Sequence, residues 1–387
     1  APREVGGLTD VTAIAIGVGQ TCAIVEGGGV RCLGSNESGE LGNGATGAMV
    51  RTPQTVIDAG GAPLAGATQL EAFDGTTCAR IGASEWSCWG DDPLGVLETS
   101  RGAKAKEVPF LRGATTMTLG SGERDLDYNE PGTSVDPATV IDFSYVCGTF
   151  ETAVRCRTAR RLHVDAEPAF GTFEIPLARA RAVASGTGVF CILTEPGEVL
   201  CNTIHVMRRR PVESTPTATC DEDWSTCEET REETQRRVVE VTDALKLEDT
   251  GGEAATAMGA GAQHACALTT SGHVECLGLT TSGEAGQSWV KGDRIARTRV
   301  GGLASIEEIA VGDAFSCART TSGEIRCWGN NSALQLGADH GGLSSETPVA
   351  AKLPDAAHAM AAGRQHACAV VGDDRRLFCW GSSYTVP

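Results

Sequence analysis

The stretch HACALTTSGHVECLG, residues 264–278, places two cysteines ten positions apart on either side of Thr-Ser-Gly. Apolar and polar residues alternate on both sides of this tripeptide, which is typical of two half-buried strands. A three-residue hairpin loop commonly contains a left-handed residue, and Gly272 suits that position. Folding the chain there sets Cys266 opposite Cys276. Directly opposed residues on antiparallel strands lie close enough for a disulfide bond, so the stretch predicts a disulfide-closed hairpin.

The same arrangement recurs along the chain, as in QTCAIVEGGGVRCLG from Gln20, FSCARTTSGEIRCWG from Phe315 and HACAVVGDDRRLFCWG from His366. In chain order the 16 cysteines form the pairs Cys22/Cys32, Cys78/Cys88, Cys147/Cys156, Cys191/Cys201, Cys220/Cys227, Cys266/Cys276, Cys317/Cys327 and Cys368/Cys379. We expect each pair to be a disulfide. Buried thiols in a reducing compartment are the alternative, but such regular pairing favours an oxidising one, and hence a secreted or periplasmic protein.

Each hairpin belongs to a longer unit. A strand-like segment and a glycine precede it, as in VTAIAIG, and CWG or CLG and a late strand such as TPVAAKLP follow it. Four short strands in about 50 residues are what a propeller blade requires. Apart from the Cys220/Cys227 pair, seven such units are present, so the sequence predicts an all-β, seven-bladed propeller as a single domain. The approximate repeats are 1–50, 51–103, 104–172, 173–212, 237–292, 293–343 and 344–387.

The motif set resembles the regulator of chromosome condensation repeat, in a bacterial, cysteine-paired version. A hydrophobic strand, glycine, His-x-Cys, TSG, CWG and N…GxLG carry the resemblance, which spans essentially the whole chain. It is strong in repeats one, five, six and seven and weaker in the other three. The resemblance implies a propeller, and it places the chain in the same broad group as a propeller-type β-lactamase inhibitory protein. It also implies that Trp89, Trp328 and Trp380 of the CWG motifs pack between strands.

The two ends of the chain predict how the ring closes. PREVGGLTDVTAIAIG near the N-terminus matches RTRVGGLASIEEIAVG, which begins at Arg297, almost position by position. The N-terminal segment therefore has the sequence of a late strand, and the last repeat ends at CWGSSYTVP without one. We expect residues 3–8 to complete the last blade, which removes an exposed sheet edge.

Two insertions interrupt the repeats. Residues 213–236 form an acidic insertion that contains Cys220 and Cys227, and Glu213 to Thr250 holds 12 acidic and 4 basic residues. A solvated loop or a disulfide-stiffened docking loop are both consistent with it. The other insertion contains Asp125, Asp127 and Asn129 at the spacing of a calcium loop. Because Glu130 stands where that loop needs glycine, we expect no calcium there and no cofactor elsewhere.

The charge balance limits the partners. With 32 basic and 50 acidic residues the net charge is −18, which opposes binding to nucleic acid. We find no apolar run long enough to span a bilayer. Arginine greatly outnumbers lysine, and glycine and alanine are abundant, which suggests a high-GC bacterial source. Residues 151–212 are an exception to the acidity, with nine arginines against six acids.

Candidate binding residues fall into three groups. By the family's geometry, the residue two positions before the first cysteine of each repeat is expected near one mouth of the channel, and histidine there is expected to hydrogen-bond within its blade. These residues are Gln20, Thr76, Tyr145, Val189, His264, Phe315 and His366. Trp224 and Trp289 are candidates for exposed recognition aromatics. Arg208, Arg209 and Arg210 belong to the arginine-rich sector, which could bind an anionic partner.

No nucleophile with its base, metal-ligand cluster or phosphate-binding loop stands out in the sequence, so we expect no enzyme activity. The favoured function is a secreted or cell-surface module that binds a protein of the envelope or surface through loops on one propeller face. A glycan-binding propeller that uses the arginine-rich sector, and an inhibitor of a secreted enzyme, are the alternatives. Self-assembly is also open.

Overall fold

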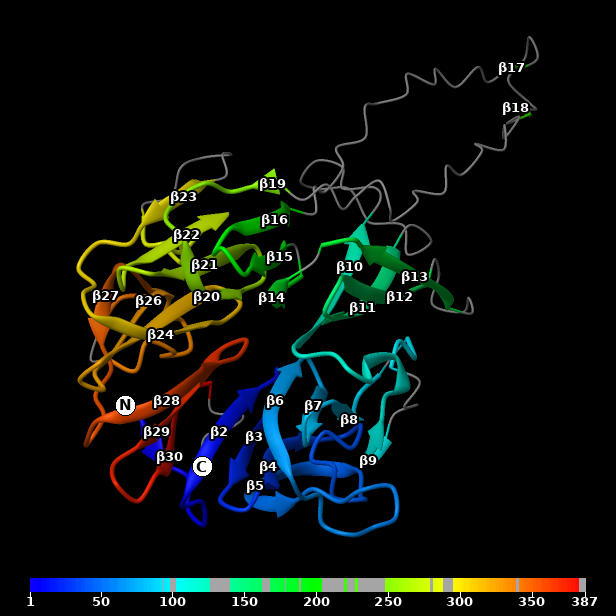
Figure 1. Cartoon of the computed structure of the whole chain (residues 1–387), viewed down its shortest axis with the longest axis horizontal. Helices are drawn as coiled ribbons and strands as arrows, with labels where there is room; N and C mark the ends of the chain where they lie inside the picture. The colour runs from blue at the N-terminus through cyan, green and yellow to red at the C-terminus, as the bar shows by residue number, and fades with distance from the viewer. Residues whose placement is uncertain are drawn as a thin grey trace.

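The computed structural model describes residues 1–92, 94–97, 102–125, 140–161, 168–177, 179–187, 189–203, 219–220, 227–228, 248–278, 281–287, 295–338 and 341–382. The strands form seven four-stranded antiparallel sheets and one two-stranded ribbon. The seven sheets are arranged around a central axis as the blades of a propeller (Figure 1). The predicted all-β, seven-bladed architecture is therefore confirmed.

Each blade runs from a first strand at the axis to a fourth strand at the rim. Blade 1 contains β2 (Val11–Ile16), β3 (Gln20–Val25), β4 (Gly29–Asn36) and β5 (Gly47–Thr55). Blade 2 contains β6 (Ala67–Phe73), β7 (Thr76–Ile81), β8 (Glu85–Gly90) and β9 (Gly102–Glu107), followed by the short helix η1 (Pro109–Leu111). Blade 3 contains β10 (Met117–Asp125), β11 (Val140–Thr149), β12 (Val154–Arg161) and β13 (Ala169–Ile175).

The remaining blades follow the same order. Blade 4 contains β14 (Ala180–Ser185), β15 (Val189–Thr194), β16 (Val199–Thr203) and β19 (Glu248–Asp249). Blade 5 contains β20 (Ala255–Ala260), β21 (His264–Thr269), β22 (Val274–Gly278) and β23 (Ile295–Arg299). Blade 6 contains β24 (Ile306–Val311), β25 (Phe315–Thr320), β26 (Ile325–Asn330) and β27 (Ser344–Ala350). Blade 7 contains β28 (Ala357–Ala362), β29 (His366–Val371), β30 (Arg376–Gly381) and β1 (Arg3–Glu4).

Disulfide bonds join the second and third strands of all seven blades. In blade 5 the register sets Cys266 opposite Cys276 and Leu268 opposite Val274, as the hairpin construction predicts. The Cα atoms of the bonded cysteines are 4.0–4.1 Å apart in each blade. In order of the blades the bonds are Cys22–Cys32, Cys78–Cys88, Cys147–Cys156, Cys191–Cys201, Cys266–Cys276, Cys317–Cys327 and Cys368–Cys379. Seven bonds between directly opposed residues indicate an oxidising environment.

The N-terminal segment closes the ring as predicted. In β1, Arg3 pairs with Cys379 and Glu4 with Phe378, and the Val5 N–H donates to the Leu377 carbonyl at 2.8 Å. Figure 1 shows the N-terminus beside the last blade. The first and last parts of the chain therefore share one sheet.

The tryptophans of the CWG motifs connect neighbouring blades. Trp89, Trp328 and Trp380 are at most 1% exposed. Each indole N–H donates to a backbone carbonyl in the preceding blade, at Glu40 (3.1 Å), Glu284 (2.9 Å) and Gln335 (2.9 Å) respectively. The three acceptors lie in the GxLG-type loops between third and fourth strands. The expectation that these tryptophans pack within the propeller is confirmed.

Candidate functional site

One face of the propeller carries both insertions. In every blade the connections from first to second strand and from third to fourth strand lie on the same side, because consecutive strands are antiparallel. Residues 126–139 connect β10 to β11, and residues 204–247 join β16 to β19 apart from the ribbon of β17 (Thr219–Cys220) and β18 (Cys227–Glu228). We call this side the insertion face. Both interruptions of the repeat pattern therefore begin and end on it.

The mouth of the channel on this face is built from a repeated backbone approach. A side chain on Gly261 would lie 2.1 Å from the Gly312 carbonyl oxygen, and one on Gly312 would lie 2.5 Å from the Gly363 carbonyl oxygen. Glycine at these positions lets the backbones of neighbouring blades nearly touch. The residue after the glycine, or after its equivalent, is exposed or partly exposed in every blade. These positions form the mouth ring, which consists of Val18, Asp74, Ser121, Thr187, Ala262, Asp313 and Arg364.

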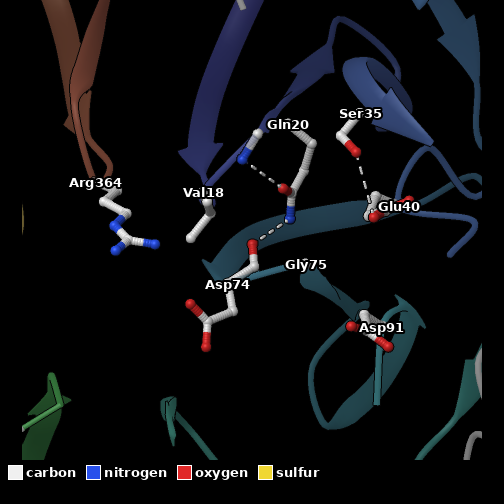
Figure 2. Close-up of a pocket in the computed structure, with 9 residues that line it drawn as sticks. Val18, Gln20, Ser35, Glu40, Asp74, Gly75, Asp91 and Arg364 are labelled. Atoms are coloured by element: carbon white, nitrogen blue, oxygen red, sulfur yellow. Dashed lines mark hydrogen bonds between the residues drawn. The ribbon is translucent and has the colours of Figure 1, made fainter. Parts of the chain in front are cut away.

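A small polar pocket lies at the mouth between blades 1, 2 and 7. Its volume is about 240 Å³, and it is lined by Val18, Gly19, Gln20, Ser35, Glu40, Asp74, Gly75, Asp91 and Arg364. Figure 2 shows the Gln20 amide bonded to the Asp74 backbone carbonyl, and the Ser35 hydroxyl directed at Glu40. Three carboxylates line the pocket with one guanidinium group. Such a lining favours a cationic group of a partner over an anionic one.

Opposite charges meet beside this pocket. The Arg364 Nε atom lies 3.5 Å from the Asp313 carboxylate, and the Arg364 side chain is 59% exposed. Burial raises the pKa of the Asp313 carboxyl, the Arg364 charge lowers it, and the Asp74 charge raises it. The Ser121 hydroxyl donates to the Asp74 carboxylate. The charged groups of the mouth ring, Asp74, Asp313 and Arg364, therefore interact electrostatically.

The seven residues predicted to line the mouth lie just beneath it. All of them are buried, with at most 9% exposure: Gln20, Thr76, Tyr145, Val189, His264, Phe315 and His366. They begin or lie within the second strand of each blade, where the next blade covers them. They do not form an exposed ring, and the exposed or partly exposed positions are those of the mouth ring instead. Binding through these residues stays a prediction.

Several of these buried residues join one blade to the next. The His264 Nε2 atom lies 2.9 Å from the Ser316 hydroxyl of blade 6, and the His366 Nε2 atom lies 3.3 Å from the Thr21 hydroxyl of blade 1. The Tyr145 hydroxyl donates to the Gly186 carbonyl of blade 4. The expectation that these histidines bond within their own blade is wrong, because a second strand faces the neighbouring sheet.

The paired cysteines link two strands within each blade and supply no reactive group to the site. The second cysteines of blades 1, 2, 4 and 6 are at most 5% exposed, and each is bonded to the first cysteine of its own hairpin: Cys32, Cys88, Cys201 and Cys327. No cysteine side chain that the structure describes is a free thiol. These cysteines therefore offer neither a nucleophile nor a metal ligand to the insertion face.

Burial of His366 predicts a loss of stability in acid. Burial lowers the pKa of His366 from 6.5 to about 4. The folded protein thus binds a proton less readily than the unfolded chain, so this contribution is intact above pH 6.5 and falls as the pH drops from 6.5 towards 4. We expect the loss to reach about 3 kcal/mol. The variant His366→Gln copies Gln20 of blade 1. Between pH 7 and pH 4 its free energy of unfolding, measured by chemical denaturation, should fall by about 3 kcal/mol less than that of the wild type. An unchanged pH dependence would contradict the assignment.

Glu71 is an unusual residue between blades 2 and 3. It pairs with Cys78, and the corresponding positions of the other blades hold small residues: Ala15, Thr118, Ala184, Gly259, Ala310 and Ala361. Burial raises the pKa of Glu71 to about 7, and the hydrogen bond from Gln69 opposes this shift. A carboxyl group with this pKa favours folding below pH 4.5, and the effect is lost as the pH rises towards 7.

Replacing Glu71 therefore has opposite consequences at the two ends of the pH range. We expect Glu71→Gln to raise the free energy of unfolding by about 1–3 kcal/mol at pH 8, because the charge that must be buried is removed. At pH 4 the two proteins should be equally stable. Urea denaturation at both pH values measures this difference. A variant that is less stable at pH 8 would show that the carboxylate is needed there.

Other predicted positions fall outside the described residues. Trp224, Trp289, Arg208, Arg209, Arg210, Asp127 and Asn129 lie there, as does the side chain of Asp125. The backbone register of β17 and β18 sets Cys220 opposite Cys227, but their side chains are not described. The roles proposed for these residues stay predictions.

Two described arginines of the arginine-rich sector are ion-paired. The Arg155 Nε atom lies 3.2 Å from a Glu174 carboxylate oxygen, and the Arg179 Nη1 atom lies 3.5 Å from a Glu195 carboxylate oxygen. Arg179 lies near the side opposite the insertion face, since its N–H donates to the Glu151 carbonyl in a turn between second and third strands. These two arginines therefore do not make one unpaired anion-binding cluster.

A serine, a histidine and a glutamate meet in blade 5, which no sequence motif indicated. The Ser271 hydroxyl donates to Glu253 at 2.5 Å and lies 3.0 Å from the His273 Nδ1 atom, which is 3.7 Å from Glu253. Hydrogen bonds from Ser271 and Thr270 lower the pKa of Glu253 to about 2. Serine and glutamate thus approach the same ring nitrogen, whereas a catalytic triad needs them on opposite nitrogens. This cluster holds the hairpin turn.

Within the described ranges, no group of three metal-ligating side chains is close enough to hold an ion. In the same residues, no helix is both long and apolar enough to cross a membrane.

Comparison with known proteins agrees with this architecture. Residues 306–335, which form most of blade 6, match the regulator of chromosome condensation (RCC1) repeat. Yeast Prp20p from Saccharomyces cerevisiae, described with its binding properties to Gsp1p and histones, is 15% identical, with a TM-score of 0.59 over 96% of this chain and 82% of that one. Human WBSCR16 is 13% identical, with a TM-score of 0.55 over 97% of this chain and 88% of that one. The receptor kinase CR4 ectodomain of Physcomitrella patens is 16% identical, with a TM-score of 0.50 over 97% and 75%.

Proposed function

We propose that this propeller of regulator of chromosome condensation repeats is a secreted or cell-surface binding module that recognises another protein through its insertion face. The observation that carries the proposal is the common origin of both insertions on the face that also holds the mouth ring and the pocket. Loops on a rigid scaffold are a common place for recognition. The ring supplies that scaffold, because a disulfide links two strands within each blade and β1 closes the last blade.

Charge supports a partner with a basic surface. The net charge of the chain is −18, and the pocket is lined by Glu40, Asp74 and Asp91 with Arg364. Complementary charge speeds association and selects partners. The seven disulfides support an oxidising location for this encounter. The link of yeast Prp20p to Gsp1p and histones supports protein recognition as a use of the fold.

The experiment compares two baits made from the folded, disulfide-intact protein. One is the unaltered chain, and the other has residues 213–236 replaced by a short glycine-serine linker. We expect a protein from the source organism's envelope or culture fluid to bind the unaltered bait and to be lost or strongly reduced on the shortened one. Matched thermal unfolding of the two baits is the control. Equal recovery on both baits would remove the acidic insertion from the binding site, and recovery of no protein by either would contradict the proposal.

A further inference from the structure

The rim of the propeller carries seven fourth strands whose outer edges can pair with another strand. The disulfide-linked residues of a hairpin are a closely spaced, non-hydrogen-bonded pair, with Cα atoms 4.1 Å apart in blade 3. The N–H and C=O groups of the second cysteine are therefore directed at the fourth strand, and the N–H and C=O groups of the residue paired with it there are directed back at the cysteine. The residue just before it on the fourth strand points its N–H outward from the rim.

In four blades this outward N–H is absent or already bonded. In three blades the residue is a proline, because proline precedes the residue that pairs with the second cysteine. These prolines are Pro53 in blade 1, Pro348 in blade 6 and Pro2 in blade 7. In blade 2 it is Ala105, whose N–H donates to the Ile57 carbonyl at 2.8 Å. Proline on an outer strand blocks pairing with a further strand.

Blade 3 lacks this protection. Phe173 pairs with Cys156, so the exposed Thr172 directs its N–H outward. The sequence of β13, AFGTFEI, contains no proline, lysine or arginine, and Phe170 is 53% exposed. Every other described fourth strand contains proline, lysine or arginine, or is two residues long. A seven-residue exposed edge with an open N–H and an exposed aromatic is a pairing site.

The charge around β13 indicates what it pairs with. The adjacent β12 carries Arg155, Arg157 and Arg161 among its residues, and the one acid of β13, Glu174, is ion-paired with Arg155. The Arg157 guanidinium lies 5.2 Å from the centre of the Phe170 ring. At physiological salt, charges beyond about 8 Å are screened, so a docked strand experiences this local positive charge rather than the net −18 of the chain. A second copy would bring the same arginines together, which disfavours self-pairing.

We propose that β13 accepts an extended acidic segment of a partner protein as a fifth strand of blade 3. The backbone of β13 supplies the hydrogen bonds, Phe170 supplies an apolar contact, and the arginines of β12 select acidic side chains. This rim site is separate from the insertion face, so it can be occupied while that face is engaged. Its failure would leave the proposed function untouched.

The test uses a fluorescein-labelled decapeptide of alternating valine and glutamate, and the same peptide with lysine in place of glutamate. Thr172→Pro transfers the edge block of blades 1, 6 and 7 to blade 3, and Thr172→Val keeps the N–H as a matched control. By fluorescence anisotropy we expect the glutamate peptide to bind the wild type and Thr172→Val equally. Binding to Thr172→Pro should be weaker by about tenfold or more, because the variant loses one backbone hydrogen bond and its ring blocks the approach of a further strand. Binding of the lysine peptide to the wild type should weaken by a similar factor, because its charge is reversed.

A second measurement avoids any folding defect in the proline variant. The glutamate peptide methylated on alternate backbone nitrogens should lose its binding to the unaltered protein, because a strand must donate those N–H groups. Equal binding of the methylated peptide, or equal binding to a folded Thr172→Pro, would overturn the proposal. So would no binding of the glutamate peptide at about 1 mM, or a dimer of the chain that Thr172→Pro abolishes, since the occupant would then be a second copy.

Discussion

Deletion of residues 1–9 is expected to lower the free energy of unfolding by roughly 5 kcal/mol or more. Val5 and Leu8 are 1% and 2% exposed and pack in a cluster shared by blades 7 and 1. Burying each such side chain contributes about 1.5–3 kcal/mol, and each backbone hydrogen bond of β1 contributes about 1 kcal/mol. The deletion also exposes the edge of β30, which promotes association. Chemical denaturation together with a measurement of molecular mass checks both effects.

Two point variants separate closure from general damage to the N-terminus. Leu8→Ala should reproduce a loss of about 2–5 kcal/mol, since it leaves a cavity between the first and last blades. Glu4→Gln removes an ion pair with Arg376 whose two side chains are 43% and 39% exposed, and should change stability by less than about 1 kcal/mol. A deletion variant as stable as the full chain would show that β1 does not hold the ring closed.

Trp328→Ala is expected to cost about 3–5 kcal/mol, the range for removing a fully buried tryptophan. Its ring is 0% exposed and packs in a cluster that joins blades 5 and 6. Its indole N–H donates to the Glu284 carbonyl at 2.9 Å, and that carbonyl would lose a partner in the variant. The midpoint of chemical denaturation, measured with the disulfides intact, reports the loss.

Trp328→Phe separates the two contributions. It retains most of the apolar contact and removes the hydrogen bond, so we expect a smaller loss of about 1–2 kcal/mol. A loss in Trp328→Ala no larger than that in Trp328→Phe would mean that packing of the ring contributes little to the joint between the blades.

The sequence predicts the hairpins and the ring well because their determinants are local. Opposed cysteines and a Thr-Ser-Gly turn set the register of blade 5, and the late-strand motif at the N-terminus identifies β1. The co-occurrence of motifs across blades has a structural reason. Tryptophan comes directly after the second cysteine in blades 2, 6 and 7. The preceding blade in each case carries a GxLG-type loop or a near variant, and this loop supplies the carbonyl that accepts the indole hydrogen bond, at Glu40, Glu284 or Gln335.

The candidate site is less predictable because exposure depends on the neighbouring blade. His264 and His366 occupy positions that look available in a single repeat, yet Ser316 and Thr21 of the following blade meet them. The mouth ring lies two positions earlier in most blades, and a glycine that permits close backbone approach marks it. That glycine was visible in the sequence, but its contact with the next blade was not. The half-buried Glu71 is likewise recognisable only by comparison with the small residues at the matching positions of the other blades.

The affinity of the captured partner for two double variants tests the role of the insertion face most directly. Asp74→Asn with Asp313→Asn removes two carboxylates from the mouth ring, whereas Glu26→Gln with Asp373→Asn removes two exposed carboxylates from turns between second and third strands on the opposite face. We expect the first variant to bind about tenfold or more weakly and with less sensitivity to salt. The second should bind as the unaltered protein does. Weakening by the second variant alone would place recognition on the opposite face and contradict the account.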